Sequence, residues 1–202
     1  MKRHRLGGFL LLGYFISSNV VKKISHFLLI AFMLLAASVV YAKDQASEAK
    51  IKAAYINQFS HFVHWSEAAG SIKKISICVL GIEDVSKELQ PLTQLTGTGF
   101  TVKLHKVTAL ENIEHCNMLY IAKSESGNLK AVLGYVDKKP VLTISSINDF
   151  AREGGMIGFV IADSKVRLEI NPGVVNRSGL NVSARLLEVS RIIETEEFKG
   201  RE

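Results

Sequence analysis

Short apolar runs, separated by short polar or helical segments, constrain the fold of this chain most strongly. Ile75–Leu80 and Cys116–Ala122 are rich in aliphatic residues and too short for helices, so they predict buried strands. Four further strands are predicted at Phe100–Val107, Val141–Ile144, Met156–Ala162 and Val166–Ile170. Short helices are predicted at Glu83–Leu89 and Gly127–Tyr135. This alternation indicates a layered α/β fold, with a mixed, mostly parallel sheet flanked by helices.

Two further segments open and close this predicted domain. A helix is expected from about Glu48 to His64, because apolar residues recur at helical spacing, namely Ile51, Ala54, Tyr55, Phe59, Phe62 and Val63. At the other end, the predicted strands Met156–Ala162 and Val166–Ile170 form a C-terminal β-hairpin. Turn residues follow, and a closing helix is predicted at Arg185–Ile193.

Residues 1–42 have the pattern of a secretory leader. Lys22 and Lys23 precede the apolar run Phe27–Val40, and Ala42 offers a small residue for cleavage. We expect cleavage after Ala42. The alternative is an uncleaved membrane anchor, but the apolar run is shorter than the roughly 20 residues that a membrane span needs. Residues 1–26 carry a second basic cluster and a second apolar run, which indicates an over-extended gene start or a long leader. A single α/β domain is then expected over residues 43–202.

The positive charge of the chain belongs mainly to this leader. The whole chain has 25 basic and 19 acidic residues, a net charge of +6, and five of the basic residues but no acidic ones lie in residues 1–42. The remainder is therefore close to neutral. It contains no basic run interleaved with aromatic residues, so the sequence gives no reason to expect a nucleic-acid partner.

Cys78 and Cys116 are the two cysteines of the chain. An even number of cysteines in an exported protein predicts a disulfide between them. Two separate buried thiols are the alternative, because the bond requires neighbouring strands with facing side chains.

The sequence offers no motif for catalysis, a metal or a cofactor. There is no G-x-S-x-G, and the cysteines lie in apolar strands, which suits structure better than a reactive thiolate. His61 and His64 are three residues apart on the predicted helix, but no third ligand is visible and a solvated helix face explains them. We therefore predict a protein that is not an enzyme and has no cofactor.

Three large aromatic residues gather at the end of the first predicted helix. Phe59, Phe62 and Trp65 are explained by core packing, or else part of this corner is exposed as a partner surface.

Four polar residues surround the predicted closing turn. They are Glu169, Asn171, Arg177 and Arg185. Local salt bridges that fix the turn are one interpretation, and a polar rim around a partner site or a small anionic ligand is the other. With no catalytic motif beside them, they are better candidates for fixing the turn or contacting a partner than for chemistry.

Four segments resemble the YfiR-like family of small exported bacterial proteins. They are KAAYINQFSHFVHWSE at Lys52–Glu67, ISICVLG at Ile75–Gly81, CNMLYIAKSE at Cys116–Glu125 together with Pro140–Ile161, and RLEIN at Arg167–Asn171 followed by SGLNVSARLLEVSRII. The resemblance covers about residues 50–193 and keeps the order of the family's segments.

The resemblance implies a periplasmic regulator. Such a protein binds the periplasmic sensor region of an inner-membrane diguanylate cyclase, or a related membrane sensor, and inhibits it, which lowers cyclic di-GMP and biofilm formation. Members of the family can dimerise, so the resemblance also implies that this chain can form a homodimer. A redox-sensing mechanism that depends on a second disulfide cannot be inferred for this chain from the resemblance, because residues 140–170 contain no cysteine. The alternative is a periplasmic small-ligand-binding protein that serves a sensor kinase or another membrane receptor, with a pocket lined by strand ends and residues 171–185.

Overall fold

The computed structural model describes residues 26–29, 48–65, 74–93 and 101–194. Residues 45–202 form one compact unit and residues 1–44 another, of which only the helical residues 26–29 are described. The predicted cleavage after Ala42 and most of the predicted leader lie outside the described residues. In the described ranges, no helix is long and apolar enough to cross a membrane.

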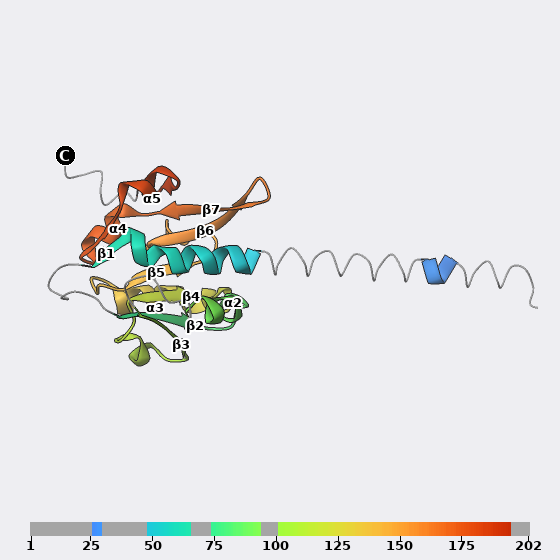
Figure 1. Ribbon diagram of the computed structural model, residues 1–202, viewed down its shortest axis with the longest axis horizontal. Coiled ribbons are helices and arrows are strands. Elements are labelled where there is room, and N and C mark those ends of the chain that lie inside the picture. The colour runs from blue at the N-terminus through green and yellow to red at the C-terminus, as the bar shows by residue number, and fades with distance from the viewer. Residues whose placement is uncertain (1–25, 30–47, 66–73, 94–100, 195–202) are drawn as a thin grey trace, which may run out of the picture. The chain divides into compact units, whose positions relative to one another are not determined.

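A mixed, mostly parallel sheet forms the centre of the domain (Figure 1). Within the described residues it has seven strands in the order β3-β2-β4-β5-β6-β7-β9. The neighbours from β3 to β6 are parallel, the β6–β7 hairpin is antiparallel, and β9 returns parallel to β7. The strands are β2 (Lys74–Leu80), β3 (Thr101–Val107), β4 (Met118–Ile121), β5 (Leu142–Ser145), β6 (Ile157–Ala162), β7 (Lys165–Ile170) and β9 (Arg191–Ile192). The predicted α/β class and the hairpin are confirmed.

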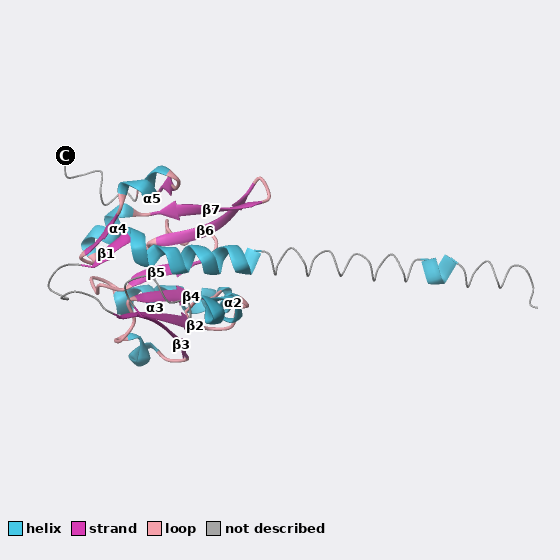
Figure 2. Ribbon diagram, in the orientation of Figure 1, coloured by secondary structure: helices cyan, strands magenta, loops and turns pink. Residues whose placement is uncertain are grey.

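Helices cover both faces of this sheet, as Figure 2 shows. Alternate residues of β2 enter two different core clusters, because side chains alternate between the faces of a strand. The first cluster includes the helix of residues 48–62 and α2 (Val85–Leu92), and the second includes α3 (Leu129–Val136). Two short 3₁₀ turns, η2 (Leu110–Ile113) and η3 (Lys123–Asn128), complete the connections.

The helix of residues 48–62 buries a different face from the predicted one. Ile51 is 43% exposed and Ala54 is also exposed, so the predicted apolar stripe is wrong at both positions. The buried face instead carries Ala49, Lys52, Ala53, Ile56 and Phe59. The prediction failed because this face includes a lysine, which an apolar pattern leaves out.

The closing segment is more broken than predicted. After β7 the chain forms α4 (Pro172–Arg177), β8 (Leu180–Val182), α5 (Ala184–Glu188) and then β9. The predicted helix Arg185–Ile193 is therefore wrong in its second half, because residues 191–192 pair with β7. β8 pairs with β1 (Val63–Trp65) in a separate antiparallel ladder that joins the two ends of the domain.

A disulfide joins Cys78 on β2 to Cys116, which lies just before β4. The two Cα atoms are 5.8 Å apart, and both residues belong to the core cluster under α3. The structure therefore contains the predicted disulfide and not the alternative of two separate thiols.

Candidate functional site

The strand order places a topological switch point between β2 and β4. From β2 the chain passes through α2 to β3 on one side, and it then crosses to β4 on the other side. The helices that follow β2 and β4 pack in different core clusters, on opposite faces of the sheet. The loops at the carboxyl ends of these strands therefore diverge, and open α/β sheets commonly bind ligands in the crevice that such divergence leaves.

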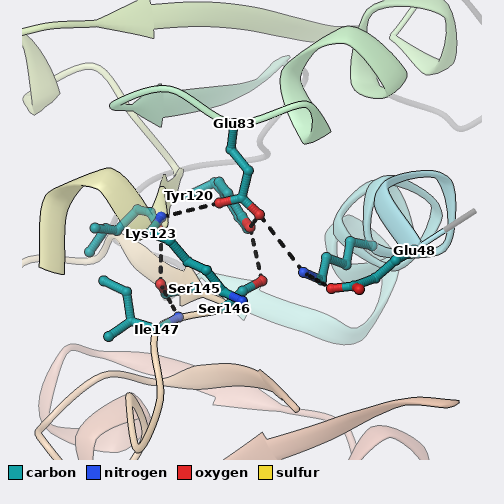
Figure 3. Close-up of polar contacts among 9 residues, drawn as sticks. Glu48, Glu83, Tyr120, Lys123, Ser145, Ser146 and Ile147 are labelled. Carbon is teal, nitrogen blue, oxygen red and sulfur yellow. Dashed lines mark hydrogen bonds and ion pairs between the residues drawn. The ribbon is translucent and has the colours of Figure 1, made fainter. Parts of the chain in front are cut away.

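The carboxylate of Glu83 organises this crevice (Figure 3). Its Oε1 accepts a hydrogen bond from the Tyr120 hydroxyl at 2.7 Å, and its Oε2 accepts one from the Lys123 backbone N–H at 3.2 Å. The Tyr120 hydroxyl also lies 3.0 Å from Ser146 Oγ. One carboxylate thus links the loop after β2 to the ends of β4 and β5.

Lys52 connects this carboxylate to the helix of residues 48–62. Its side chain is 5% exposed, and its Nζ forms ion pairs with Glu48 and, at 3.8 Å, with Glu83 Oε1. A buried ammonium is costly unless it is paired, so these contacts explain how a lysine can lie on the core face of the helix. The helix is thereby coupled to the carboxyl edge of the sheet.

Tyr120 remains a neutral hydroxyl in this network. Burial, and next the negative charge of Glu83, raise the pKa of Tyr120 far above its ordinary value, because both disfavour the phenolate. The hydroxyl therefore stays available as a hydrogen-bond donor to Glu83.

Two pockets open beside Glu83. The larger, which we call the edge pocket, has a volume of about 690 Å³ and is lined by residues 80–84, the first turn of α2, residues 106–108 and Glu125. The smaller measures about 190 Å³ and lies between Glu48, Lys52 and Lys123. Glu83 and Asp84 line both pockets. This arrangement suits the binding of a small polar molecule, and no group of three metal-ligating side chains occurs in the part of the chain that the structure describes.

The aromatic residues predicted as partner contacts lie mainly in the core. Phe59 is fully buried and stacks with Phe159 at 6.2 Å between ring centroids. Phe62 and Trp65 are half-buried and pack against the same cluster. Only these last two retain surface that a partner could contact.

The predicted polar residues divide into a buried pair and an exposed pair. Glu169 forms an ion pair with Arg191, and Asn171 caps α4 by accepting from the Val174 N–H at 3.1 Å. Both are 1% exposed, so their contacts fix the closing segment. Arg177 and Arg185 are exposed. The β1–β8 ladder brings the Phe62–Trp65 end of the helix beside this segment, and the Ser183 N–H donates to the Phe62 carbonyl at 2.8 Å.

The sequence reasoning missed Lys52, Glu83 and Tyr120. A signal for Lys52 was present, because it falls at helical spacing between Ala49 and Ile56, on what proves to be the buried face. Glu83 follows the strand-ending Gly81, and Tyr120 lies near the end of a predicted strand. Nothing local indicated that the two would meet, because their pairing depends on β2 and β4 being neighbours.

Replacing Tyr120 with phenylalanine tests the network. Tyr120→Phe removes the hydroxyl that joins Glu83 to Ser146, and it leaves the carboxylate one donor short. We expect a loss of about 1–3 kcal/mol in the free energy of unfolding, measured by urea denaturation. The matched control is Tyr135→Phe, because among the described residues the Tyr135 hydroxyl makes one long, exposed contact, with Glu114 at 3.5 Å. Equal effects of the two substitutions would contradict the role assigned to Tyr120.

This fold defines a doubly wound α/β domain with a polar crevice at its switch point. The family model described as YfiR/HmsC-like matches residues 49–191, and the chain belongs to that family. The family comprises periplasmic regulators of diguanylate cyclase signalling.

Comparisons with curated proteins and with solved structures do not extend the family assignment. A search of curated proteins gave no match. Among solved structures, the chain is similar to a conserved domain protein from Vibrio cholerae O1 biovar El Tor strain N16961, with 12% sequence identity and a TM-score of 0.46. The match covers 62% of this chain and 55% of that one, so this chain aligns with little more than half of the other protein.

Proposed function

We propose that this protein is a non-enzymatic periplasmic regulator that binds the periplasmic sensor region of an inner-membrane diguanylate cyclase and inhibits it. The observation that carries the proposal is the family match over residues 49–191. Export after removal of residues 1–42 and self-association as a homodimer belong to the same proposal. The second candidate, a small-ligand-binding protein that serves another membrane receptor, is favoured by the pockets at the carboxyl edge.

The closing segment offers the surface for this partner. Arg177 and Arg185 are exposed, and so are Val189 and Arg191, at 69% and 64%. Ile192 is 41% exposed on the edge strand β9. Arginine beside exposed aliphatic side chains is a common composition of protein interfaces. Because Arg191 is already paired with Glu169, the charges of Arg177 and Arg185 are the ones that favour acidic groups on the partner. We call residues 177–192 the C-terminal surface.

Inhibition requires that this surface bind the inactive cyclase more tightly than the active one, because equal affinity for both would leave their ratio unchanged. A preference of about 3 kcal/mol would change the inactive-to-active ratio by roughly 150-fold.

The variant Arg177→Glu tests the C-terminal surface. It reverses one charge at an exposed position at the end of α4, so we expect the protein to fold while repression is lost and cyclic di-GMP rises toward the level of a gene deletion. Cyclic di-GMP and biofilm would be measured in cells that carry the variant in place of the wild type. A thermal unfolding curve of the purified variant confirms folding.

Lys130→Glu is the matched control, because it reverses one exposed charge on α3. It should leave repression intact. Unchanged repression by a folded Arg177→Glu protein would exclude this residue from the partner surface. A gene deletion that leaves cyclic di-GMP unchanged would overturn the proposed function itself.

A further inference from the structure

We propose that the edge pocket is a binding site for a short peptide of two or three residues with free, charged ends. Its volume of about 690 Å³ lies within the range of pockets that hold small molecules, about 300–1,000 Å³. The pocket lies at the carboxyl ends of β2 and β3, beside the switch point.

Most charges around the pocket are already neutralised within the protein. Glu83 is held by Lys52 and by two hydrogen-bond donors, and Asp84 forms an ion pair with Lys87 at 2.7 Å. Two charged groups are left for a ligand, and they have opposite signs.

The first group is Lys106 at the end of β3, which is exposed and has no ion pair or side-chain hydrogen bond within the described ranges. The second is Glu125 in η3, whose carboxylate accepts one hydrogen bond from the Asn128 amide at 3.2 Å and has no ion-pair partner among the described residues. A ligand that neutralises both groups carries one anionic and one cationic group, as a peptide with a free carboxylate and a free ammonium does.

Glu125 and Lys106 reach the pocket from the two sides of the end of β2. A Cβ atom at Gly81, which follows β2, would lie 2.9 Å from Glu125 Oε1, and Lys106 on β3 is the register partner of Val79 on β2. A peptide carries its ammonium and its carboxylate at opposite ends, about 3.3–3.6 Å apart for each residue when extended. Two or three residues can therefore place one end at each group and a side chain between them.

The surroundings of the pocket suit an apolar side chain between the charged ends. Leu80, Val107 and Ile82 line it, and Ile82 is 88% exposed. Gly81 keeps the loop open for Glu125, because a Cβ atom at Gly81 would lie 2.9 Å from Glu125 Oε1. Gly81 also has a φ of +87°, which other residues rarely adopt.

The test uses the full-length gene product, purified as the cell processes it, and the tripeptide Ala-Leu-Ala. Isothermal titration should show saturable binding of the peptide with free ends. Acetylation of its amino end or amidation of its carboxyl end should each weaken binding by about tenfold or more, because each removes a charge-assisted hydrogen bond. Free leucine should bind more weakly than the tripeptide by a similar factor.

Variants locate the site. Lys106→Met and Glu125→Gln should each reduce affinity by about tenfold or more, whereas Lys103→Met, on the same strand but outside the pocket, should not change it. The double variant Lys106→Glu with Glu125→Lys should bind better than either single reversal, because it restores one charge of each sign.

Three results would overturn the proposal: no saturable binding at about 10 mM peptide, equal binding of the doubly capped peptide, or wild-type affinity of Lys106→Met. None of these results depends on cyclase inhibition, so the proposed function is tested separately.

Discussion

Replacing both cysteines, Cys78→Ala together with Cys116→Ala, is expected to lower the free energy of unfolding by about 4 kcal/mol. The two residues are 38 positions apart in the sequence, and closing a loop of that length removes much of the conformational freedom of the unfolded chain. Both residues are also buried, in the cluster under α3. Urea denaturation under oxidising conditions would measure the loss.

Reduction of the wild type provides the control. Under reducing conditions the wild type and the double variant should unfold at nearly the same urea concentration, because neither then contains the bond. A remaining difference would report the packing of the two side chains alone. A loss below about 1 kcal/mol under oxidising conditions would contradict a stabilising role for the disulfide.

The central sheet could be predicted from the sequence because its strands are encoded locally. Ile75–Leu80 and Cys116–Ala122 are apolar on both faces, and the structure buries them between two helical layers. A short apolar run of this kind, in a domain of this size, has few alternatives to forming a buried strand. The hairpin is also encoded locally, because the apolar strand β6 and the alternating strand β7 are joined by Asp163 and Ser164, both with positive φ.

The short strands at the edges could not be predicted in this way. β1, β8 and β9 have three, three and two residues, which is too few for a periodic pattern. Their formation depends on pairing with segments distant in sequence, such as Trp65 with Leu180. The predicted closing helix failed for the same reason, because its last residues pair with β7.

The candidate site was missed because its groups come from distant parts of the chain. Lys52, Glu83 and Tyr120 meet only when the first helix, the loop after β2 and the end of β4 are in place. A lysine on a buried helix face is a usable signal, since such a residue needs a carboxylate partner. It indicates that a polar contact exists, but it does not identify the partner.

The second large effect is expected from Arg191→Met. Glu169 is 1% exposed near the carboxyl end of β7, and its carboxylate forms an ion pair with Arg191 on the neighbouring strand β9. Removing the guanidinium would leave a buried carboxylate without its counter-charge, which costs about 3–5 kcal/mol in buried pairs. We expect the lower end of this range in urea denaturation at neutral pH, because Arg191 itself is 64% exposed.

Two further variants separate this effect from the loss of an exposed side chain. Arg185→Met removes an exposed arginine from the same closing segment and should change the free energy of unfolding by less than about 0.5 kcal/mol. The double variant Glu169→Gln with Arg191→Met should regain part of the loss, because the buried group is then neutral. An Arg191→Met loss in the free energy of unfolding as small as that of Arg185→Met would contradict the role of the ion pair in holding β9 against β7. The backbone pairing of residues 191–192 would then be what holds that strand.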